Sequence, residues 1–515
     1  MTRTILIACA ALIGGGLPGG VSSAVAAEDG FRAIFDGKTL AGWSAPDMRY
    51  WSVEDEAITA RSSAEVPCTK NQFLTWQLGD LDDFELKLEF RILGGKRANS
   101  GVQIRSEIHP DGHAVGYQAD MDRGDRWLGA LYDEHTGRRI LARRGQRTEI
   151  DENGRRTHSA VDVSGFEFRR DGWNEYHITA RGPRITLKVN GTLTAEVVDR
   201  EGGQRDLAGK LALQIHAGPP MTVQFRNVRL KRHPLSGGRK KIALVAGRPS
   251  HASGQHEFNA GMKLLAKRLR KIDSVVTASY HDGGWPRDPS AFDNVDAIVV
   301  YADGQRSHPL LHHFDEVDAL MRRGVGLMCM HYAVHVEPGR EGSLFQKWIG
   351  GFYETGFSAN PHWEADLKTH PDHPIVRGVD PGKIHDEWYF SIRFREESKG
   401  VAKILEAKPD DKARSRNGYP PRPYPHIIAA SGQSETLMWA VEREDGGRGI
   451  GFTGGHWHRN WAHDLQRQAV LNAILWVAGA EVPPKGLESA PVTEEELNEN
   501  LDRKRKMVRV KLSGN

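Results

Sequence analysis

The chain has 515 residues, with 70 Lys plus Arg against 67 Asp plus Glu. This near balance of charge gives no support for a nucleic-acid partner, and the length is enough for two or three domains. Histidine is the unusual component, because 16 of the 23 histidines lie between positions 240 and 480. That density points to metal binding or acid–base chemistry in the second half of the chain.

Residues 1–27 have the pattern of a secretory signal peptide. Arg3 supplies a short positive region, residues 5–13 are apolar, and small residues at 24–27 form a cleavage site. No other run predicts a transmembrane helix, so we expect a secreted or periplasmic protein. Only Cys68 and Cys329 remain after cleavage, in different predicted domains, and no disulfide framework is expected.

Residues 28–232 have the pattern of an all-β domain. Short runs of alternating apolar and polar residues recur, for example at Phe84–Phe90, Tyr176–Ala180 and Ile185–Val189, and turn residues such as Asn190-Gly191 separate them. No amphipathic helix of any length interrupts these runs. The pattern predicts a two-sheet sandwich of jelly-roll type.

The same alternation predicts a polar sheet face in this domain. Val102 and Ile104 point to one face of a strand, which places Gln103 on the other. If the strands near 98–105, 116–121, 128–134 and 211–216 are neighbours, one face carries Gln103, Arg105, Gln118, Asp120, Tyr132, Glu134, Gln214 and His216. A merely solvated face would show the same alternation. However, the mixture of amides, carboxylates, guanidinium, His and Tyr favours a site for a polyhydroxylated ligand.

An ordered series of motifs runs through residues 31–232. They are Phe35–Trp43, Trp51–Asp55, Phe84–Leu86, Asn99–Arg105, Gly172–Tyr176, Asn190-Gly191, Leu213–His216 and Phe225–Val228. Together they resemble the 3-keto-disaccharide hydrolase family. The resemblance implies a concanavalin-like jelly roll that acts on 3-keto-glycosides.

The polar face suits that chemistry. A ketone at C3 acidifies the hydrogen on C2, so a base can drive elimination of the C1 substituent, and water can then add to give net hydrolysis. The route needs a base, an electrophile on the C3 oxygen and an acid at the leaving oxygen. We expect His216 or Asp120 as the base, Arg105 or a bound cation as the electrophile, and Tyr132 or Glu134 as the acid. The expected substrate-binding residues are Asn99, Gln103, Gln118 and Gln214.

After a short flexible linker at 233–240, residues 241–480 alternate between strands and helices. Continuous apolar strands are predicted at 241–247, 275–280, 297–303 and 325–331, with helices at 257–270 and 314–323. This pattern predicts a parallel, doubly wound sheet. Ligands of such sheets bind beyond the carboxyl ends of the strands, where Gly247–His256, Asp303-Gly304 and His331–His335 fall.

A second ordered series of motifs spans this half. They are Val245–His251, His256–Phe258, Asp303-Gly304, His331-Tyr332, Ile349–Phe352, Asn360–Trp363, His373–Gly378, His385–Tyr389 and Gly454–His458. They resemble the ThuA-like (trehalose-utilisation) family, which is related to class I glutamine amidotransferases and implies a flavodoxin-like α/β fold. The site predicted for this half comprises His251, His256, Asp303, His331, His335, Trp363, Asp386, Glu387, Tyr389, His456 and His458. Glutaminase activity is not expected, because Cys329 lies within an apolar run and His456-Trp-His458 lacks an acidic partner.

A divalent metal ion is the cofactor that two histidine pairs could hold. His331 and His335 are four residues apart, which places them on one face of a helical turn, and His456 and His458 lie on one side of a strand. Asp386 and Glu387 could add oxygen ligands or act as acid–base groups. A metal-free carbohydrate site with Trp stacking is the alternative.

The charged tail at 481–515 contains Thr493 before three glutamates, which predicts a short capped helix packed on the body, or else a disordered extension. The sequence therefore predicts an exported two-domain enzyme of sugar catabolism, with a small-molecule carbohydrate as its partner. Two alternatives stay open. The sandwich could be a non-catalytic carbohydrate-binding module, or the second half could be a structural or partner-docking domain whose histidines need not share a pocket.

Overall fold

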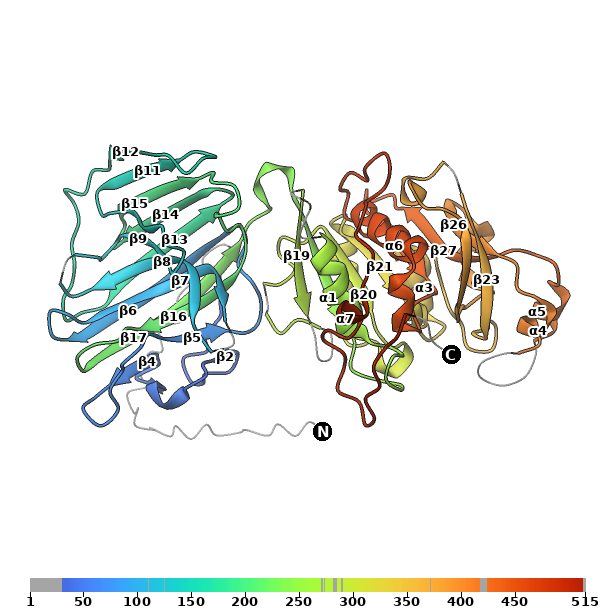
Figure 1. Cartoon of the computed structure of the whole chain (residues 1–515), viewed down its shortest axis with the longest axis horizontal. Coiled ribbons are helices and arrows are strands. Elements are labelled where there is room, and N and C mark those ends of the chain that lie inside the picture. The colour runs from blue at the N-terminus through green and yellow to red at the C-terminus, as the bar shows by residue number, and fades with distance from the viewer. Residues whose placement is uncertain are drawn as a thin grey trace, which may run out of the picture.

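The computed structural model describes residues 30–512, with gaps at 110, 125, 270–271, 273, 281–284, 289, 371 and 417–423. The predicted signal peptide at 1–27 lies outside the described residues. A β sandwich and an α/β domain lie side by side (Figure 1). Within the described ranges, no helix has the length and apolarity needed to cross a membrane.

The sandwich has two sheets. The larger has the strand order β12-β11-β15-β14-β13-β6-β17-β4-β3, with β1 beside β17, and the smaller has the order β10-β9-β8-β7-β16-β5-β2. The larger sheet consists of β1 (Arg32–Ala33), β3 (Trp51–Glu54), β4 (Ala57–Ser62), β6 (Phe84–Gly94), β11 (Gln146–Ile150), β12 (Arg156–Ala160), β13 (Asn174–Arg181), β14 (Arg184–Val189), β15 (Thr192–Asp199) and β17 (Met221–Arg232). The smaller consists of β2 (Trp43–Ser44), β5 (Gln72–Trp76), β7 (Asn99–Ile108), β8 (Ala114–Asp122), β9 (Leu131–Glu134), β10 (Arg139–Ala142) and β16 (Lys210–Ile215).

The predicted alternation decides which side chains form the sandwich core. Every second residue of β6 from Phe84 to Ile92 is buried in one apolar cluster, together with Val102 and Ile104 of β7 and Leu213 of β16. The polar residues between them face outward. The predicted two-sheet arrangement is therefore observed, and the opposite face of the smaller sheet is free to carry a site.

The α/β domain is built on a nine-stranded sheet of order β19-β18-β20-β21-β28-β27-β26-β23-β24, and β22 and β25 form a separate pair. Its strands are β18 (Lys240–Ala246), β19 (Val275–Tyr280), β20 (Ala297–Tyr301), β21 (Gly326–Met330), β22 (Gly351–Phe352), β23 (His362–Thr369), β24 (Gly382–Glu387), β25 (Arg393–Phe394), β26 (Val401–Ala407), β27 (Glu435–Glu442) and β28 (Arg448–Phe452). Its α-helices are α1 (Phe258–Leu269), α2 (Phe314–Arg322), α3 (Arg340–Trp348), α4 (Asp411–Arg414), α5 (Pro425–Ala429), α6 (Asp464–Val477) and α7 (Glu494–Leu497).

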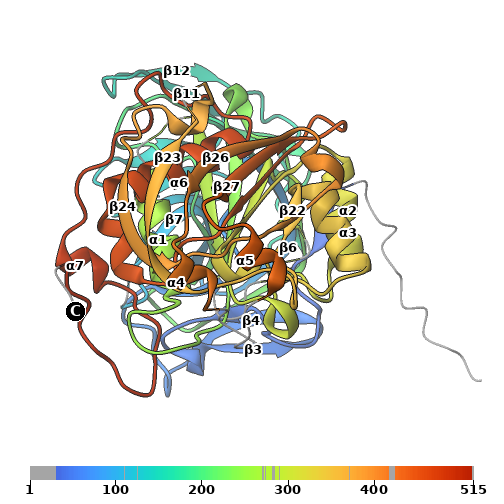
Figure 2. The ribbon, with the colours of Figure 1, turned by 90° about the vertical axis from the view of Figure 1, so that its right-hand side faces the viewer.

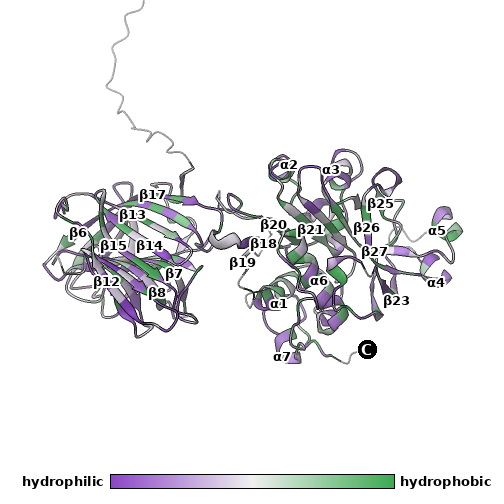
Figure 3. Ribbon diagram, turned by 90° about the horizontal axis from the view of Figure 1, so that it is seen from above, coloured by the Kyte–Doolittle hydropathy of each residue, from purple (hydrophilic) through white to green (hydrophobic). Residues whose placement is uncertain are grey.

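The central strands of this sheet are buried on both faces. Along β18, Ile242 and Leu244 belong to the cluster under α1 and α6, whereas Ala243 and Val245 belong to the cluster under α2 and α3. Figure 2 shows the two helix pairs on opposite sides of the sheet, and Figure 3 shows β20 and β21 coloured as hydrophobic. A strand covered by helices on both faces needs a continuous apolar run, which is the pattern that predicted it.

The four strands predicted at 241–247, 275–280, 297–303 and 325–331 pair in parallel as expected, but the sheet continues beyond them with strands that were not predicted. The strands β19, β18, β20, β21 and β28 are parallel, but β27, β26, β23 and β24 continue the sheet with antiparallel pairing. The short turn between Glu442 and Arg448 joins β27 to β28. So short a connection permits only antiparallel neighbours, because a parallel pair needs a crossover of a dozen or more residues.

The tail folds back onto α1. Thr493 and Glu496 form a reciprocal capping box at the start of α7. Arg268 of α1 binds the Glu496 carboxylate, with both Nη–Oε distances at 2.9 Å, and Lys504 donates to backbone carbonyls of the loop 252–256. The predicted packed helix is thus observed, and the tail supports the loop that precedes α1.

A buried polar network joins the two domains. The Asp82 carboxylate lies 2.6 Å from the Lys241 ammonium and accepts from the Asn294 amide at 2.9 Å. In parallel, the Arg232 guanidinium lies 2.9 Å from the Asp288 carboxylate. Burial alone would raise the pKa of Asp82, but the Lys241 and Arg232 cations lower it below its ordinary value. The linker is held as well, because the backbone N–H of Ser236 donates to Asp83 at 2.7 Å.

Replacing Asp82 with alanine is expected to destabilise the chain strongly. The substitution leaves the buried Lys241 ammonium without its carboxylate partner, whereas Arg232 keeps Asp288, and a broken buried pair of this kind costs about 3–5 kcal/mol. Urea unfolding followed by intrinsic fluorescence measures the loss. Arg340→Ala removes an exposed ion pair with Asp315 and serves as the control, with no measurable change expected. Equal midpoints for D82A and the parent would contradict the assigned role.

Candidate functional site

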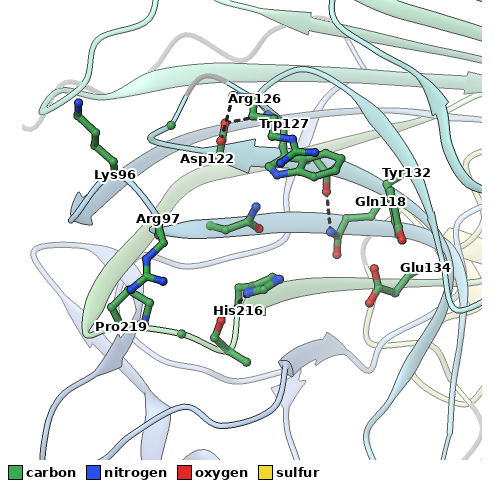
Figure 4. A pocket seen from close by; sticks show the side chains of 15 residues that line it. Lys96, Arg97, Gln118, Asp122, Arg126, Trp127, Tyr132, Glu134, His216 and Pro219 are labelled. Carbon is green, nitrogen blue, oxygen red and sulfur yellow. Dashed lines mark hydrogen bonds between the residues drawn. The ribbon is translucent and has the colours of Figure 1, made fainter.

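A pocket of about 750 Å³ opens on the outer face of the smaller sheet. Six of the residues predicted for the catalytic and substrate-binding site of this domain line it: Asn99, Gln118, Asp120, Tyr132, Glu134 and His216. Figure 4 shows Gln118, Tyr132, Glu134 and His216 pointing into one shared space. These side chains come from β7, β8 and β9 and from His216, the residue that follows β16. The four strands β9, β8, β7 and β16 are neighbours in the sheet.

A row of side-chain hydrogen bonds fixes the floor of the pocket. Ser106 Oγ donates to Gln103 Oε1 at 2.7 Å, and Gln103 Nε2 donates to Gln118 Oε1 at 2.8 Å. Gln118 Nε2 then donates to Asp120 Oδ1 at 2.7 Å. Because each amide is bonded through both its oxygen and its nitrogen, the orientation of Gln118 is set. Gly101 gives this amide its space, since a Cβ there would lie 2.5 Å from the Gln118 side chain.

Two carboxyl groups of the pocket are harder to ionise than usual. Burial raises the pKa of Asp120 well above its ordinary value, although the Gln118 hydrogen bond works in the opposite direction. Burial also raises the pKa of Glu134, and the nearby His216 and His113 offset part of that rise. Glu134 Oε1 lies 2.9 Å from His135 Nε2. Burial therefore favours the protonated form of Asp120, which can donate a hydrogen bond, more than solvent would.

His216 presents one defined ring nitrogen to the pocket. Its Nδ1 lies 2.6 Å from the carbonyl oxygen of Ala217, which can only accept a hydrogen bond. The Nδ1 atom therefore carries the proton of the neutral ring. The Nε2 atom is left with a lone pair, which is the form that a general base requires.

The wall of the pocket is a loop held by Asp122. The Asp122 carboxylate accepts the backbone N–H groups of residues 126, 127 and 128 at 2.9–3.1 Å. This places the Trp127 ring edge-on to Tyr132, with 6.4 Å between the ring centroids, and the Arg126 guanidinium 4.7 Å from the Trp127 ring. An aromatic ring beside a set of hydrogen-bonding groups is suited to a sugar ring.

Three predicted members of the polar face do not line this pocket. Arg105 is buried and donates to Asp83 at 3.0 Å and to the carbonyl of Gly182 at 2.6 Å, at the end of the sandwich near the linker. The cause is a register shift in β7 after Ile104, where Arg105 has a φ of 48°, so the side chain leaves the face that alternation gave it. The predicted electrophilic role of Arg105 is therefore wrong.

The other two are amides beneath the pocket. Gln103 does not line the pocket, but its side-chain amide donates a hydrogen bond that orients Gln118. Gln214 is fully buried, and neither of its amide atoms has a partner among the residues that the structure describes. Sequence reasoning also missed residues that do line the pocket: Lys96, Arg97, Asp122, Arg126 and Trp127. Lys96, Arg97, Arg126 and Trp127 lie in loops, to which period-two alternation does not apply, whereas Asp122 ends β8 and continues the alternation of Gln118 and Asp120.

A second cluster lies in the α/β domain at the carboxyl ends of the parallel strands. His256 follows β18, His331 follows β21, His456 follows β28, and Glu387 ends β24. One ring nitrogen or carboxylate oxygen from each of the four lies within 4.8 Å of the others. The predicted convergence of distant segments on this edge is thus observed.

The distances within this histidine cluster are short. His256 Nε2 lies 3.0 Å from both His331 Nε2 and His456 Nδ1. Glu387 Oε2 lies 3.1 Å from His456 Nδ1 and 3.5 Å from His331 Nε2. Burial lowers the pKa of His456 to about 4 and also holds the pKa values of His256 and His331 well below the ordinary histidine value. In contrast, burial raises the pKa of Glu387 to about 7. The three imidazoles are therefore neutral at physiological pH.

Other predicted residues surround the cluster. Asp303 Oδ1 lies 2.8 Å from His256 Nδ1, and the exposed His251 ring stacks on His256 with 3.6 Å between centroids. The Tyr389 hydroxyl lies 3.4 Å from His331 Nε2 and 3.3 Å from Glu387 Oε2. The backbone of His251, His256 and His331 has φ values of 60°, 46° and 57°. Such left-handed conformations are uncommon outside glycine and gather at functional sites.

Each of the two histidine pairs predicted to bind a metal ion has one member that lies outside the cluster: His335 in the first pair and His458 in the second. Residues 331–334 form a 3-10 turn rather than an α-helical turn, and His335 bonds Thr355 Oγ1 at 2.8 Å instead of joining His331. His458 is fully buried toward the tail at Leu497, because residues 458–462 form another 3-10 turn rather than a strand.

Trp363 and Asp386 hold neighbouring backbone in place and do not belong to the group of four residues that converge in the cluster. The Trp363 indole donates to the carbonyl of Trp388 at 3.0 Å within the apolar cluster. Asp386 is fully buried and accepts from the backbone N–H groups of Gly455 and Trp457 at 2.8 and 3.3 Å. It therefore holds the loop that carries His456. Cys329 is also fully buried with a raised thiol pKa.

Asn360 and His362 were missed, although they lie in a motif that carried the ThuA resemblance. Asn360 Nδ2 donates to Glu387 Oε1 at 3.0 Å, and the exposed His362 ring lies 4.8 Å from that of His456. Their place next to Trp363 in the chain was the available signal.

Residues 30–231 match the model of the 3-keto-alpha-glucoside-1,2-lyase-like domain, and residues 243–477 match the trehalose utilisation (ThuA) model. The chain joins a 3-keto-alpha-glucoside-1,2-lyase-like domain to a ThuA domain. Both resemblances seen in the sequence are thereby confirmed. The two matches support a carbohydrate-processing role for the chain. No curated protein matches it.

Solved structures match each domain separately. The carbohydrate binding module CBM66 from Bacillus subtilis is 18% identical, with 37% of this chain and 95% of that chain covered and a TM-score of 0.26. A proposed glycosyl hydrolase from Parabacteroides distasonis is 19% identical, with 40% and 94% covered and a TM-score of 0.27. A proposed ThuA-like protein from Parabacteroides merdae is 16% identical, with 51% and 99% covered and a TM-score of 0.34.

Replacing Gly101 with alanine is expected to disturb the lyase-like pocket from below. The new Cβ would lie 2.5 Å from Gln118 Cγ and Cδ, so the amide must leave its bonds to Gln103 and Asp120. Overpacking of this kind costs about 1–3 kcal/mol. Urea unfolding measures that loss. Gly95→Ala is the matched control, because nothing lies within 4 Å of a Cβ there. Equal stability of G101A and G95A would contradict the close packing of Gln118.

Proposed function

We propose that the lyase-like domain cleaves 3-keto-glycosides by removing the proton from C2. The observation that carries this proposal is the convergence of His216, Asp120, Tyr132 and Glu134 on one pocket. These groups supply a lone pair, a neutral carboxyl donor, a hydroxyl donor and a second acid. An enolising ketone needs this set, because charge develops on its oxygen while the carbon loses a proton.

In this proposal His216 Nε2 takes the C2 proton. The Ala217 carbonyl holds Nδ1–H, so the free lone pair faces the pocket. Asp120 and Tyr132 donate hydrogen bonds to the C3 oxygen and replace Arg105 in that role. A carboxyl group kept neutral by burial beside a tyrosine hydroxyl is an established device for stabilising an enolate.

Glu134 then donates a proton to the leaving oxygen at C1. Its raised pKa keeps a larger fraction of the carboxyl protonated than an exposed glutamate would have. Loss of the C1 substituent leaves an enone-like sugar, and addition of water across that double bond gives net hydrolysis. The ordered amides Asn99 and Gln118 and the Trp127 ring bind the sugar.

We further infer the finer architecture and the location. The two-sheet sandwich supports a concanavalin-like jelly roll. In the ThuA domain, the parallel strands β19-β18-β20-β21-β28 follow the order 2-1-3-4-5, which supports a flavodoxin-like fold. The ThuA domain binds or transforms a related keto-sugar. The pattern of residues 1–27 supports export to the periplasm or the medium.

A carbohydrate-binding module without catalysis is the competing function. Such modules rely on exposed aromatic platforms, whereas ionisable groups predominate in this pocket and Trp127 and Tyr132 are its two aromatic residues apart from His216. The buried carboxyl of Asp120, with its raised pKa, is the kind of group that gathers at catalytic sites. These features favour the enzyme.

His216→Gln is expected to lower kcat/KM for a chromogenic 3-keto-glucoside by about 10²- to 10⁴-fold, because it removes the general base. Release of the chromophore by the full chain measures the effect. Glu107→Gln, an exposed carboxylate of the same sheet, is the control and should retain activity. Turnover by H216Q at the parent rate would reject the assignment.

The pH profile is expected to have an alkaline limb that belongs to Asp120. Its neutral form is the active donor, so this contribution is lost as the pH rises through the raised pKa of Asp120, whereas the acid side of the profile reflects the need for an unprotonated His216. Asp120→Asn keeps an N–H donor, so its reduced activity should lose this limb. Asp120→Ala removes the donor and should cost about 10²–10³ in kcat. The role fails if D120N keeps the alkaline limb of the parent.

A further inference from the structure

The histidine cluster of the ThuA domain has fixed ring tautomers. His331 Nδ1 lies 3.0 Å from the carbonyl oxygen of Thr453, which can only accept, so this nitrogen carries the proton. His256 Nδ1 lies 2.8 Å from the Asp303 carboxylate and donates to it. In both rings the proton points away from the cluster. The Nε2 atoms of His256 and His331 therefore carry lone pairs.

These two lone pairs face each other across 3.0 Å. No hydrogen bond can form between two acceptors, and His456 does not supply what is missing. A proton on His456 Nδ1 can serve either His256 Nε2 at 3.0 Å or Glu387 Oε2 at 3.1 Å, but it leaves the His256–His331 contact without a donor. A cation between the donor atoms would turn this repulsion into attraction.

The spacing of the four atoms fits a coordination sphere. Metal–nitrogen bonds of about 2.0–2.1 Å place neighbouring ligand atoms about 2.9–3.4 Å apart in octahedral or tetrahedral geometry. The four close separations here are 3.0, 3.0, 3.1 and 3.5 Å. An outward Nδ1–H bound to a carboxylate or a backbone carbonyl is also the usual support of a metal-ligating histidine.

We propose that His256, His331, His456 and Glu387 bind one divalent transition-metal ion, and that an oxygen atom of a carbohydrate reaches this ion from the rim formed by His251 and His362. Three imidazoles and one carboxylate suit zinc, iron or manganese better than calcium or magnesium. The three ligand histidines are buried and Glu387 is half-buried, whereas both rim histidines are exposed. Tyr389, within 3.4 Å of two ligand atoms, lies where it can hydrogen-bond the bound oxygen.

This site is separate from the lyase-like pocket. Its four ligands all come from the ThuA domain, at residues 256–456, whereas the pocket is built from residues 96–219. The proposal therefore goes beyond the proposed function. Failure of one does not decide the other.

The test uses the purified full chain, treated with a chelator and then titrated with Zn²⁺ by calorimetry. We expect saturable binding of one ion per chain. Glu387→Gln and His456→Gln should each weaken binding by more than about 100-fold. Asp303→Asn replaces the charged acceptor of the His256 Nδ1–H by a neutral amide and should weaken binding by about 10- to 100-fold. His335→Gln, a buried histidine of the same domain outside the cluster, is the matched control and should bind like the parent.

Co²⁺ replacement gives an independent signature, because visible absorption bands report nitrogen and oxygen ligation. The bands should change in E387Q and stay unchanged in H335Q. Circular dichroism shows which variants are folded. The D303N variant changes none of the four proposed ligands, so it still tests the proposal if the ligand variants fail to fold. Absence of saturable Zn²⁺ binding, or equal affinities for the parent and D303N, would overturn the proposal.

Discussion

Two consecutive buried carboxylates, Asp82 and Asp83, hold the molecule together. Asp82 binds Lys241 and Asn294 across the domain boundary, and Asp83 binds Arg105 of the smaller sheet and the backbone of the linker. Buried charges must be paired, so these contacts fix where the linker leaves the sandwich and where β18 begins. They also remove Arg105 from the polar face, so the electrophilic role in the pocket is left to neutral donors.

The two sites use the same device on different scaffolds. One lies on a sheet face and the other beyond the ends of parallel strands. In each, a backbone carbonyl binds the Nδ1–H of a histidine, from Ala217 to His216 and from Thr453 to His331. The lone pair on Nε2 is thereby directed into the site. A single histidine with its lone pair free can take a proton, whereas several facing one another can hold a cation.

A site residue could be predicted from the sequence where its position depends on the local strand pattern, and not where it depends on contacts with distant residues. Alternation placed Gln118, Asp120 and Glu134 correctly, because the pairing of β8 and β9 is regular. It failed for Arg105, because β7 shifts its register after Ile104 and the Arg105 side chain binds the distant Asp83 instead. Likewise, His331, His256 and His456 could be expected at one sheet edge from the strand pattern. The 3-10 turns that turn His335 and His458 away, and the joining of Glu387 to the cluster, depend on tertiary contacts that no local pattern contains.

The central claim is that the lyase-like pocket removes the hydrogen from C2. Its most direct test is to incubate the full chain with a 3-keto-glucoside that carries deuterium at C2, and to measure deuterium in the early product by mass spectrometry. Elimination followed by addition of water replaces that deuterium with a solvent proton, so the account predicts its loss. A product that retains all of its deuterium would show direct hydrolysis and would contradict the account.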